Sequence, residues 1–341
     1  MNLTFVTRQL TLNHTFAVAN SSKKSVENTF VRIQSDDYVG YGEAAPSYFY
    51  HENTASIRRV LETAIPMLQH FQASIQLMMD QIGEAIPGNF AAKTGIELAL
   101  LDLVAKRKMV SIRELFGIKN DRSLTTSFTI GIDNLDVIKA KVIAAKDYPI
   151  LKVKLGTRED YEIIKAIRSI TDKKLRIDAN EGWTKEEAVE KINWLETQNV
   201  ELIEQPLPAD EIANTAWIRE RVNLPLFADE SVKRSGDIEP LAEAFDGINI
   251  KLMKCGGVHE AVNMAKTARR FHLSTMLGCF IESSLAITAA AHIAPLFDYI
   301  DLDGALLLKN DPFAGVTFAN GQFTLPDKYG IGAEPLVDMG W

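Results

Sequence analysis

The sequence predicts an α/β protein built as a modified (β/α)8 TIM barrel with an additional α+β capping domain. Three observations lead to this fold class. The chain has 341 residues, 46% of them hydrophobic, whereas a parallel barrel takes about 250, so a second domain is expected. From about residue 122 onward, short apolar runs alternate with amphipathic helical segments. The Gly-x-Gly-x-x-Gly turn of a dinucleotide-binding open sheet, the alternative architecture, follows no first strand here.

Residues 1–121 are expected to form the capping domain. Residues 3–12, 29–33 and 38–46 have the alternation of antiparallel strands, and residues 17–24 are polar and turn-like. Helical spacing covers residues 56–68, 75–86 and 91–106, and the last helix is expected to continue into residues 112–117. The aromatic cluster at residues 48–51 either covers a ligand or packs locally. We expect the C-terminal tail, residues 310–341, to return to this domain.

Residues 122–309 are expected to form the barrel. Eight apolar runs follow one another, and helical segments separate most of them, which predicts eight parallel strands and seven helices, a (β/α)7β barrel. The runs begin at Ser123, Ile150, Lys174, Glu201, Leu226, Ile248, Ser274 and Tyr299.

Composition excludes several classes of partner. The net charge is -8 and the pI about 5.4, and the basic pairs 23–24 and 269–270 are too small to indicate nucleic acid or an acidic membrane. The first twelve residues lack a leader pattern, and no segment reaches the ~20 apolar residues of a membrane span. We therefore expect a cytoplasmic protein. Two cysteines, Cys255 and Cys279, cannot build a disulfide framework or a cysteine metal site, and we expect both to be reduced near strand ends.

Functional groups in such a barrel come from the C-terminal ends of the strands. Three acids at the ends of consecutive strands would converge at the barrel mouth, and without a cation their repulsion would cost several kcal/mol. Oxygen ligands suit Mg2+ better than zinc. The alternative is a structural network in which each acid pairs with a lysine. The charged residues at the strand ends are Lys152, Lys154, Asp178, Glu204, Asp229, Lys251, Asp301 and Asp303.

The lysines at these ends predict proton transfer. Alternation along residues 150–156 sends Lys152 and Lys154 to one face, where burial and like charge would lower the pKa of at least one. The alternative is an edge strand with two solvated lysines. Lys154 and Lys251 lie one strand to either side of the three acids, so each could reach one face of a bound carboxylate. A metal on the carboxylate would stabilise the enediolate that forms when the α-proton leaves. Such an arrangement inverts a carbon centre.

Five motifs resemble the enolase superfamily, in its muconate-lactonizing (mandelate racemase/muconate lactonizing enzyme-like) subgroup, and Gly40-Tyr-Gly-Glu-Ala44 extends the resemblance to the capping domain. Members of that superfamily use a Lys or His base with Mg2+. The motifs are Leu151-Lys-Val-Lys-Leu-Gly156, Arg176-Ile-Asp-Ala-Asn180, Ile203-Glu-Gln-Pro206, Ala228-Asp-Glu-Ser231 and Asn249-Ile-Lys-Leu-Met-Lys-Cys-Gly-Gly257.

The resemblance implies a role for each matching residue. Asp178, Glu204 and Asp229 would bind one Mg2+ per subunit, and Lys154 and Lys251 would be the acid/base pair. Lys152 would face the substrate carboxylate, and its charge would help to lower the pKa of Lys154. Asn180 and Glu230 would orient ligands and lysines. By its spacing, Lys254 faces a different way from Lys251 and is expected to be structural.

Two stretches are similar to the dipeptide epimerase family of this subgroup. Asp301 and Asp303 match an Asp-x-Asp pair that holds the substrate ammonium, which o-succinylbenzoate synthases and muconate cycloisomerases do not need. Residues 278–282 resemble a loop whose backbone N–H groups contact substrate. Cys279 and Phe280 replace its usual Ser-Met, and Ile281 follows. Thr129 also matches a substrate-contacting position.

Ser21 departs from the pattern, because Ala-Glu epimerases place an arginine at the matching position. Lys23 and Lys24 are near but out of register, and a buried acidic side chain would then be unpaired. We therefore expect an Ala-X dipeptide epimerase with X small or apolar, such as Ala-Ala, including the D-Ala-D-Ala of peptidoglycan turnover. A homo-oligomer is compatible with the sequence.

Other activities remain open. An o-succinylbenzoate synthase or N-acylamino acid racemase of the same subgroup is the nearest alternative. A Schiff-base aldolase would use a barrel-end lysine to attack a carbonyl, and a non-catalytic barrel is the remaining alternative.

Overall fold

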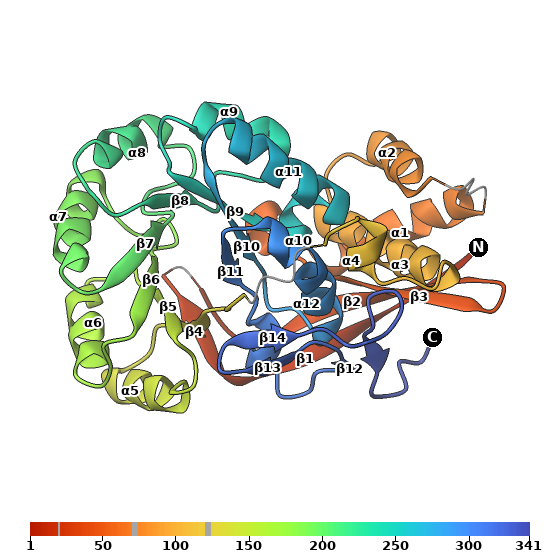
Figure 1. Cartoon of the computed structure of the whole chain (residues 1–341), viewed down its shortest axis with the longest axis horizontal. Helices are drawn as coiled ribbons and strands as arrows, with labels where there is room; N and C mark the ends of the chain where they lie inside the picture. The colour runs from red at the N-terminus through yellow and green to blue at the C-terminus, as the bar shows by residue number, and fades with distance from the viewer. Residues whose placement is uncertain (20, 70–73, 120–123) are drawn as a thin grey trace.

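The computed structural model describes residues 1–19, 21–69, 74–119 and 124–341. A barrel of parallel strands with its outer helices occupies the left of Figure 1, and an antiparallel sheet with several helices occupies the right. The fold class expected from the sequence, a barrel with a separate antiparallel capping domain, is confirmed.

The capping sheet is antiparallel, in the order β1 (Asn2–Val18), β2 (Ser21–Ser35) and β3 (Tyr38–Ala44). The β1–β2 pairing runs from Asn2 opposite Gln34 to Val18 opposite Ser21, with one irregularity after Thr11. The turn expected over residues 17–24 is therefore wrong. Ser21 and Ser22 still pair with β1, because ladder hydrogen bonds come from the backbone and tolerate polar side chains.

Helices α1 (Thr54–Leu68), α2 (Ile75–Ala85) and α3 (Phe90–Arg107) follow. Helix α3 packs closely on β3 because two glycines face it: a Cβ on Gly40 would lie 2.0 Å from the Ala99 carbonyl oxygen. The expected continuation of α3 into residues 112–117 is wrong. Ser111 caps a separate short helix, α4 (Ile112–Leu115), in a reciprocal pair of hydrogen bonds with Glu114.

Eight parallel strands form the barrel in sequence order, and a bridge between Thr126 and Ile300 brings the first strand region against the last. The expected start of the first strand, Ser123, lies outside the described residues. The strands are β4 (Phe128–Ile130), β5 (Ile150–Lys154), β6 (Lys174–Asp178), β7 (Val200–Glu204), β8 (Leu226–Ala228), β9 (Gly247–Lys251), β10 (Ser274–Gly278) and β11 (Tyr299–Asp301).

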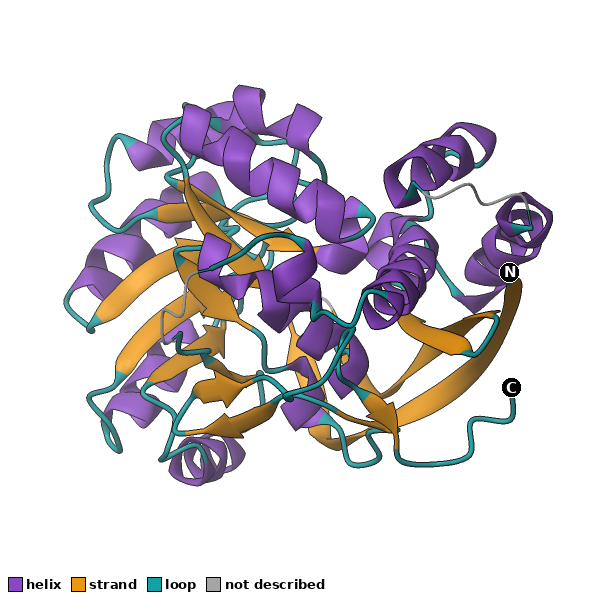
Figure 2. Cartoon of the chain, turned by 45° about the vertical axis from the view of Figure 1, so that its right-hand side comes forward, coloured by secondary structure: helices purple, strands orange, loops and turns teal. Residues whose placement is uncertain are grey.

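Helices surround these strands (Figure 2), and at least one follows each of the first seven, while β11 is followed by a 3-10 turn, Gly304–Leu307. This is the expected (β/α)7β pattern. The helices are α5 (Leu135–Ala144), α6 (Asp160–Arg168), α7 (Lys185–Glu196), α8 (Ile212–Arg219), α9 (Ile238–Leu241), α10 (Leu252–Cys255), α11 (Val258–Arg270) and α12 (Ser284–Ile293).

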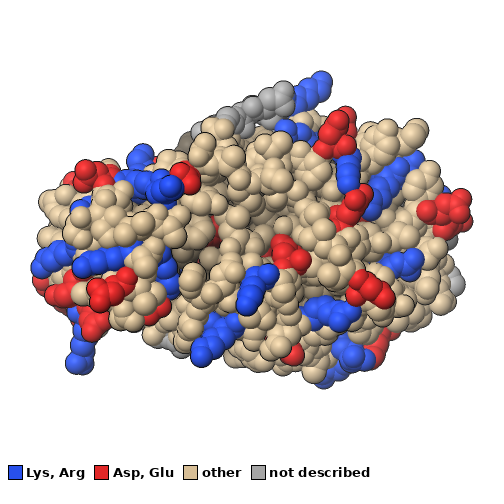
Figure 3. Space-filling view, turned by 90° about the horizontal axis from the view of Figure 1, so that it is seen from below, with Lys and Arg blue, Asp and Glu red and all other residues tan. Residues whose placement is uncertain are grey.

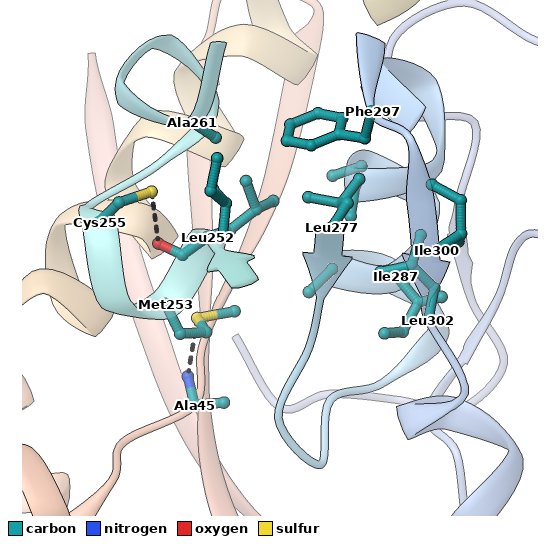
Figure 4. Close-up of a cluster of buried hydrophobic side chains, with 14 of the residues drawn as sticks. Ala45, Leu252, Met253, Cys255, Ala261, Leu277, Ile287, Phe297, Ile300 and Leu302 are labelled. Carbon is teal, nitrogen blue, oxygen red and sulfur yellow. Dashed lines mark hydrogen bonds between the residues drawn. The ribbon is translucent and has the colours of Figure 1, made fainter. Parts of the chain in front are cut away.

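A buried apolar cluster fixes β9 and β10 against the helices near the capping domain (Figure 4). In it Leu252, Leu277 and Phe297 are 1% exposed or less. The backbone N–H of Ala45, at the end of the capping sheet, contacts the Met253 sulfur at 3.4 Å, so the cluster also joins the two domains. Both cysteines are free, as expected, and Cys255 is buried in α10.

The tail contacts both domains. A hairpin of β13 (Thr317–Ala319) and β14 (Gln322–Thr324) lies at the start of the barrel, where Gly321 accepts a hydrogen bond from the Thr126 N–H at 2.8 Å. Strands β12 (Phe313–Ala314) and β15 (Glu334–Pro335) pair nearby. Phe313 stacks on Phe30 of the capping sheet, and the Ile331 N–H donates to Asp102 of α3 at 2.7 Å.

Acidic and basic side chains are interspersed on the face shown in Figure 3. Among the described residues, no helix has both the length and the apolar character needed to cross a membrane.

Candidate active site

Three carboxylates meet at the C-terminal ends of neighbouring strands. Asp178 ends β6, Glu204 ends β7, and Asp229 directly follows β8. Parallel pairing sets Asp178 opposite Glu204, and one oxygen from each of the three acids lies within 4.8 Å of the others. All three are buried. Three convergent oxygen donors fit a hard divalent cation such as Mg2+.

Amines lie on both sides of the three acids. Lys154 Nζ of β5 is 2.6 Å from Asp178 Oδ2, and Lys251 Nζ of β9 is 2.6 Å from Asp229 Oδ2. Lys152 Nζ is 2.8 Å from Glu204 Oε2 and 3.1 Å from Asp178 Oδ2. The alternative of an edge strand with solvated lysines is wrong, because β5 pairs with strands on both sides and its lysines are buried. These lysine–carboxylate ion pairs alone would also fit the alternative interpretation, in which each acid pairs with a lysine and binds no metal.

The neighbouring carboxylates shift the pKa values of Lys152 and Lys251 upward. Burial alone would lower the pKa of Lys152, but Asp301, Glu204 and Asp178 outweigh burial and raise it well above its ordinary value. Burial and Asp229 act on Lys251 in the same opposed way, and the net direction of its pKa is also upward. The sequence prediction considered burial and like charge, whereas the folded chain surrounds these amines with carboxylates.

A cavity of ≈ 400 Å³ opens above this centre. Asp178 and Glu204 are buried and do not line it, whereas Lys154 and Lys251 do. A purely structural network of ion pairs does not require lysines that line a cavity. The cavity brings together the other site residues expected from the sequence: Ser21, Thr129, Lys152, Lys154, Asn180, Asp229, Glu230, Lys251, Cys279, Phe280, Ile281, Asp301 and Asp303.

Two buried aspartates lie on the β11 side of the cavity. Asp301 accepts hydrogen bonds from Lys152 Nζ at 2.8 Å and Ser127 Oγ at 2.6 Å. Asp303 Oδ2 accepts one from the Thr129 backbone N–H at 2.6 Å. Burial and then the neighbouring Asp301 raise the pKa of Asp303 to about 6. A cation placed between these carboxylates would relieve their repulsion.

The aromatic cluster at residues 48–51 contributes to the cavity wall. Tyr48, Phe49 and Tyr50 all line it. The Tyr50 ring centroid is 6.2 Å from that of Phe280, and Lys251 Nζ is 5.1 Å from the Phe280 centroid. Three of the four residues thus line the cavity, and Phe49 packs on Tyr50, so the structure is compatible with both sequence interpretations.

Asn180 and Glu230, which the resemblance implied would orient ligands and lysines, contact each other beside the acids. Asn180 donates through Nδ2 to Glu230 Oε1 at 3.2 Å and through its backbone N–H to Asp178 Oδ1 at 3.0 Å. Burial and then Asp229 raise the pKa of Glu230 to about 8. Both residues therefore contact or flank acids of the proposed metal site.

Two further residues contact the acids, and no role for the first of them, Asn249, was expected from the sequence. Asn249 of β9 donates through Nδ2 to Glu204 Oε1 at 2.8 Å. Lys254 of α10 also reaches the acids, with Nζ 2.5 Å from Asp229 Oδ1, but it does not line the cavity and approaches the carboxylate oxygen that Lys251 does not contact. The helical turn that follows β9 returns position 254 toward Asp229. The available signal for Asn249 was a polar residue inside an apolar strand, Ile-Asn-Ile.

Lys23 was also misjudged. Ser21 begins β2 and lines the cavity as expected, but Lys23 lines the same cavity. Alternation explains this result, since residues two apart on a strand face the same side. Burial lowers the pKa of Lys23. The cavity thus contains a lysine two residues from Ser21, where the sequence prediction expected no cation in register.

Both domains of the chain match known protein families. Residues 1–117 match the mandelate racemase / muconate lactonizing enzyme N-terminal domain, and residues 137–339 match the enolase C-terminal domain-like family. The chain belongs to the enolase superfamily. Within it, the chain is 40% identical over 336 residues to the L-Ala-D/L-Glu epimerase of Bacteroides thetaiotaomicron, covering 97% of this chain and 87% of that protein.

Two further enolase-superfamily relatives cover nearly the whole chain. The L-Ala-D/L-amino acid epimerase of Pedosphaera parvula is 41% identical over 344 residues, 97% of this chain and 99% of that protein. The crystal structure of a dipeptide epimerase from Cytophaga hutchinsonii, complexed with Mg and D-Ala-L-Val, superposes with a TM-score of 0.92 at 30% identity, covering 99% of this chain and 97% of that one.

Proposed function

We propose that this protein is a Mg2+-dependent dipeptide epimerase that inverts the α-carbon of the second residue of Ala-X dipeptides. The observation that carries the proposal is the position of Lys154 and Lys251 on strands that flank the three acids, with each amine 2.6 Å from a different carboxylate. Relatives that are epimerases of dipeptides, one of them complexed with Mg, support the same reaction.

Each group has a defined task in this reaction. Asp178, Glu204 and Asp229 would hold Mg2+, which when bound supplies positive charge to the substrate carboxylate. One lysine, neutral at that moment, takes the α-proton, and the other, as an ammonium, gives a proton to the opposite face of the carbon. The enzyme thus ends with the same number of protons, and the carbon is inverted.

Asp301, which ends β11, and Asp303, two residues after it, support a substrate with a free amino group. Asp301 is paired with Lys152, and the carboxylate of Asp303 adjoins it with a backbone N–H as its donor. An ammonium bound there would supply the positive charge that this buried pair favours. An N-acylated amino acid or a succinylbenzoate precursor would bring no such charge, so the alternatives within the subgroup are less well supported.

The side chain of X has both apolar and charged surroundings. Phe16, Val18 and Val26 line the cavity and fit the small or apolar residue expected from the sequence. Lys23 lines it too, and it can pair with an acidic side chain, so the argument against Ala-Glu loses its premise. We therefore include an acidic X among the substrates.

The experiment is deuterium exchange in heavy water with purified protein, Mg2+ and Ala-Ala, Ala-Leu and Ala-Glu. The α-proton of the second residue should exchange, and a chelator should stop the exchange. Lys154→Ala and Lys251→Ala should each lower epimerisation by about 10² to 10⁴ while Mg2+ binding persists. No exchange with any dipeptide, together with turnover of an N-acylamino acid or a succinylbenzoate precursor, would overturn the proposal. Borohydride trapping of a carbonyl substrate would indicate the aldolase.

A further inference from the structure

Glu43 is a fully buried carboxylate outside the proposed reaction chemistry. It lies near the end of β3 in the capping domain, yet all but one of its partners belong to the barrel. Its oxygens accept hydrogen bonds from the Ser283 N–H at 2.9 Å, the Ser283 Oγ at 2.5 Å and the Ala286 N–H at 3.3 Å. These groups form the N-terminus of α12, where a carboxylate is favoured. The capping domain therefore supplies the cap of a barrel helix.

Asn28 extends this contact to the cavity. It lies on β2, lines the cavity, and is 1% exposed. Its Nδ2 donates to Glu43 Oε1 at 2.7 Å and to the Ile281 carbonyl oxygen at 3.0 Å. One amide group thus connects Glu43 to a loop residue that also lines the cavity.

Several hydrogen bonds hold the loop of residues 279–283, among them one from Cys279 Sγ to the Asp301 carbonyl oxygen at 3.3 Å. Besides the Ile281 carbonyl and Ser283, the Phe280 N–H donates to the carboxylate of Glu282 at 2.7 Å. Among the hydrogen bonds of the described residues, none uses the Ile281 N–H. The capping domain therefore fixes the carbonyl of Ile281, and its N–H remains available for a ligand.

Glu97 provides a matched comparison. It too is a buried carboxylate of the capping domain, on α3, and it caps another barrel helix through the Val258 N–H and the His259 Nδ1, the latter at 2.8 Å. Glu97 does not line the cavity, and neither do the helix residues that it contacts. The two glutamates share the interdomain cap and differ in whether it reaches the substrate-facing loop.

We propose that Glu43, acting through Asn28 and Ser283, positions the loop of residues 279–283 and thereby sets the affinity of the cavity for its substrate. The inference rests on the proposed function in treating this loop as substrate-facing. Glu43 is a positioning residue, because it touches the loop and helix α12 rather than the cavity.

Hydrogen exchange tests the positioning without any assay of activity. In Glu43→Gln the side-chain amide presents N–H groups to donors, so the amides of residues 283–286 should exchange at least about tenfold faster than in the parent protein. Residues 258–261 should exchange as in the parent protein. In Glu97→Gln the pattern should be reversed. Unchanged exchange at residues 283–286 in Glu43→Gln would overturn the proposal.

Steady-state kinetics on Ala-Leu with saturating Mg2+ provides the second readout. Glu43→Gln should raise KM about tenfold or more with kcat within about threefold, because the loss is in substrate binding. Glu97→Gln should leave KM within about twofold. If Glu43→Gln does not fold, Asn28→Ala removes the link to Ile281 while the cap on α12 stays, and it should also raise KM. Equal effects of the Glu43 and Glu97 variants on KM would indicate general domain docking and overturn the inference.

The two readouts separate this inference from the proposed function. If the parent protein turned over no dipeptide, the proposed function would fail, while the exchange pattern would still decide whether Glu43 holds the loop. If the dipeptide reaction is present and the KM values of all three variants match the parent protein, the positioning inference alone fails.

Discussion

Lys254 Nζ lies 2.5 Å from Asp229 Oδ1, on the carboxylate whose other oxygen is 2.6 Å from Lys251 Nζ. Lys254 also donates to the backbone oxygens of Asp229 and Asn249. Its side chain is fully buried. The lysine therefore fixes the orientation of a proposed metal ligand from behind, while Lys251 reaches it from the cavity.

Lys254→Met should weaken Mg2+ binding by about 10- to 100-fold, because a ligand that loses its orienting partner binds metal less well. It should also destabilise the fold, by about 3 to 5 kcal/mol where a buried ion pair is broken on one side. Isothermal titration with Mg2+ and thermal denaturation check the two effects. Lys266→Met, on the exposed face of α11, is the control. Unaltered Mg2+ affinity would assign Lys254 to the fold alone.

Lys23→Met should reduce kcat/KM for Ala-Glu by about tenfold or more relative to Ala-Leu, because an acidic side chain would lose its cation in a partly buried cavity. Competition between the two dipeptides, followed by mass-detected deuterium uptake, gives the ratio directly. Lys24→Met removes the same charge one position along the strand, where the side chain is exposed, and should not change the ratio. A ratio that fell equally in both variants would point to long-range charge rather than to a contact.

His292 should make the protein less stable in mild acid. Burial lowers its pKa from 6.5 to about 4, and the neutral ring is held between the Ile331 carbonyl and the Arg113 N–H. The unfolded chain binds the proton first, so stability falls as the pH drops from about 6.5 to 4, by about 3 kcal/mol in all. Urea unfolding at several pH values measures this slope.

His292→Gln should reduce the loss of folding stability that the parent protein shows as the pH drops from about 6.5 to 4. Burial acts oppositely on Glu43 and Glu282, because it raises their pKa values to about 7 and about 8 and so makes stability fall as pH rises. Comparing the free energies of unfolding of the variant and the parent protein at each pH therefore isolates the contribution of His292. Parallel slopes in the two proteins would show that His292 does not titrate in this range.

Gly257→Ala should destabilise the junction between capping domain and barrel. Gly257 has φ 129°, and a Cβ there would lie 1.9 Å from Glu97 Oε2. A rigid backbone and a buried carboxylate leave little room to adjust, so we expect a loss of about 2 kcal/mol or more. Gly236→Ala, where nothing lies within 4 Å of the added atom, is the control. Differential scanning calorimetry compares the two, and similar melting temperatures would contradict the prediction.

Local patterns were sufficient for the barrel and for the position of its acids. The rhythm of short apolar runs predicted the eight strands, and parallel pairing requires that their C-terminal ends lie at one rim, which brings Asp178, Glu204 and Asp229 together. The same rule predicted amines on both sides of them. No long-range information was needed, because strand order follows the chain.

Boundaries within the capping domain were less predictable. Polar residues 21–24 resemble a turn, but backbone pairing continues through them, and this moved Lys23 from an assumed loop into the cavity wall. The break after α3 depended on Ser111 and its reciprocal bonds with Glu114. Both results depend on which backbone groups find partners, and hydrophobic periodicity does not report that.

The sequence by itself determined the fold class, the ends of the strands and the set of charged residues gathered there, because periodicity and parallel order suffice for these. Only the tertiary structure decided the charge environment of Lys152, the direction of Lys254 and the reach of Glu43 and Glu97 into the barrel. The reason is physical: ionisation and side-chain direction depend on neighbours distant in sequence, and those neighbours are known only after the two domains have packed together.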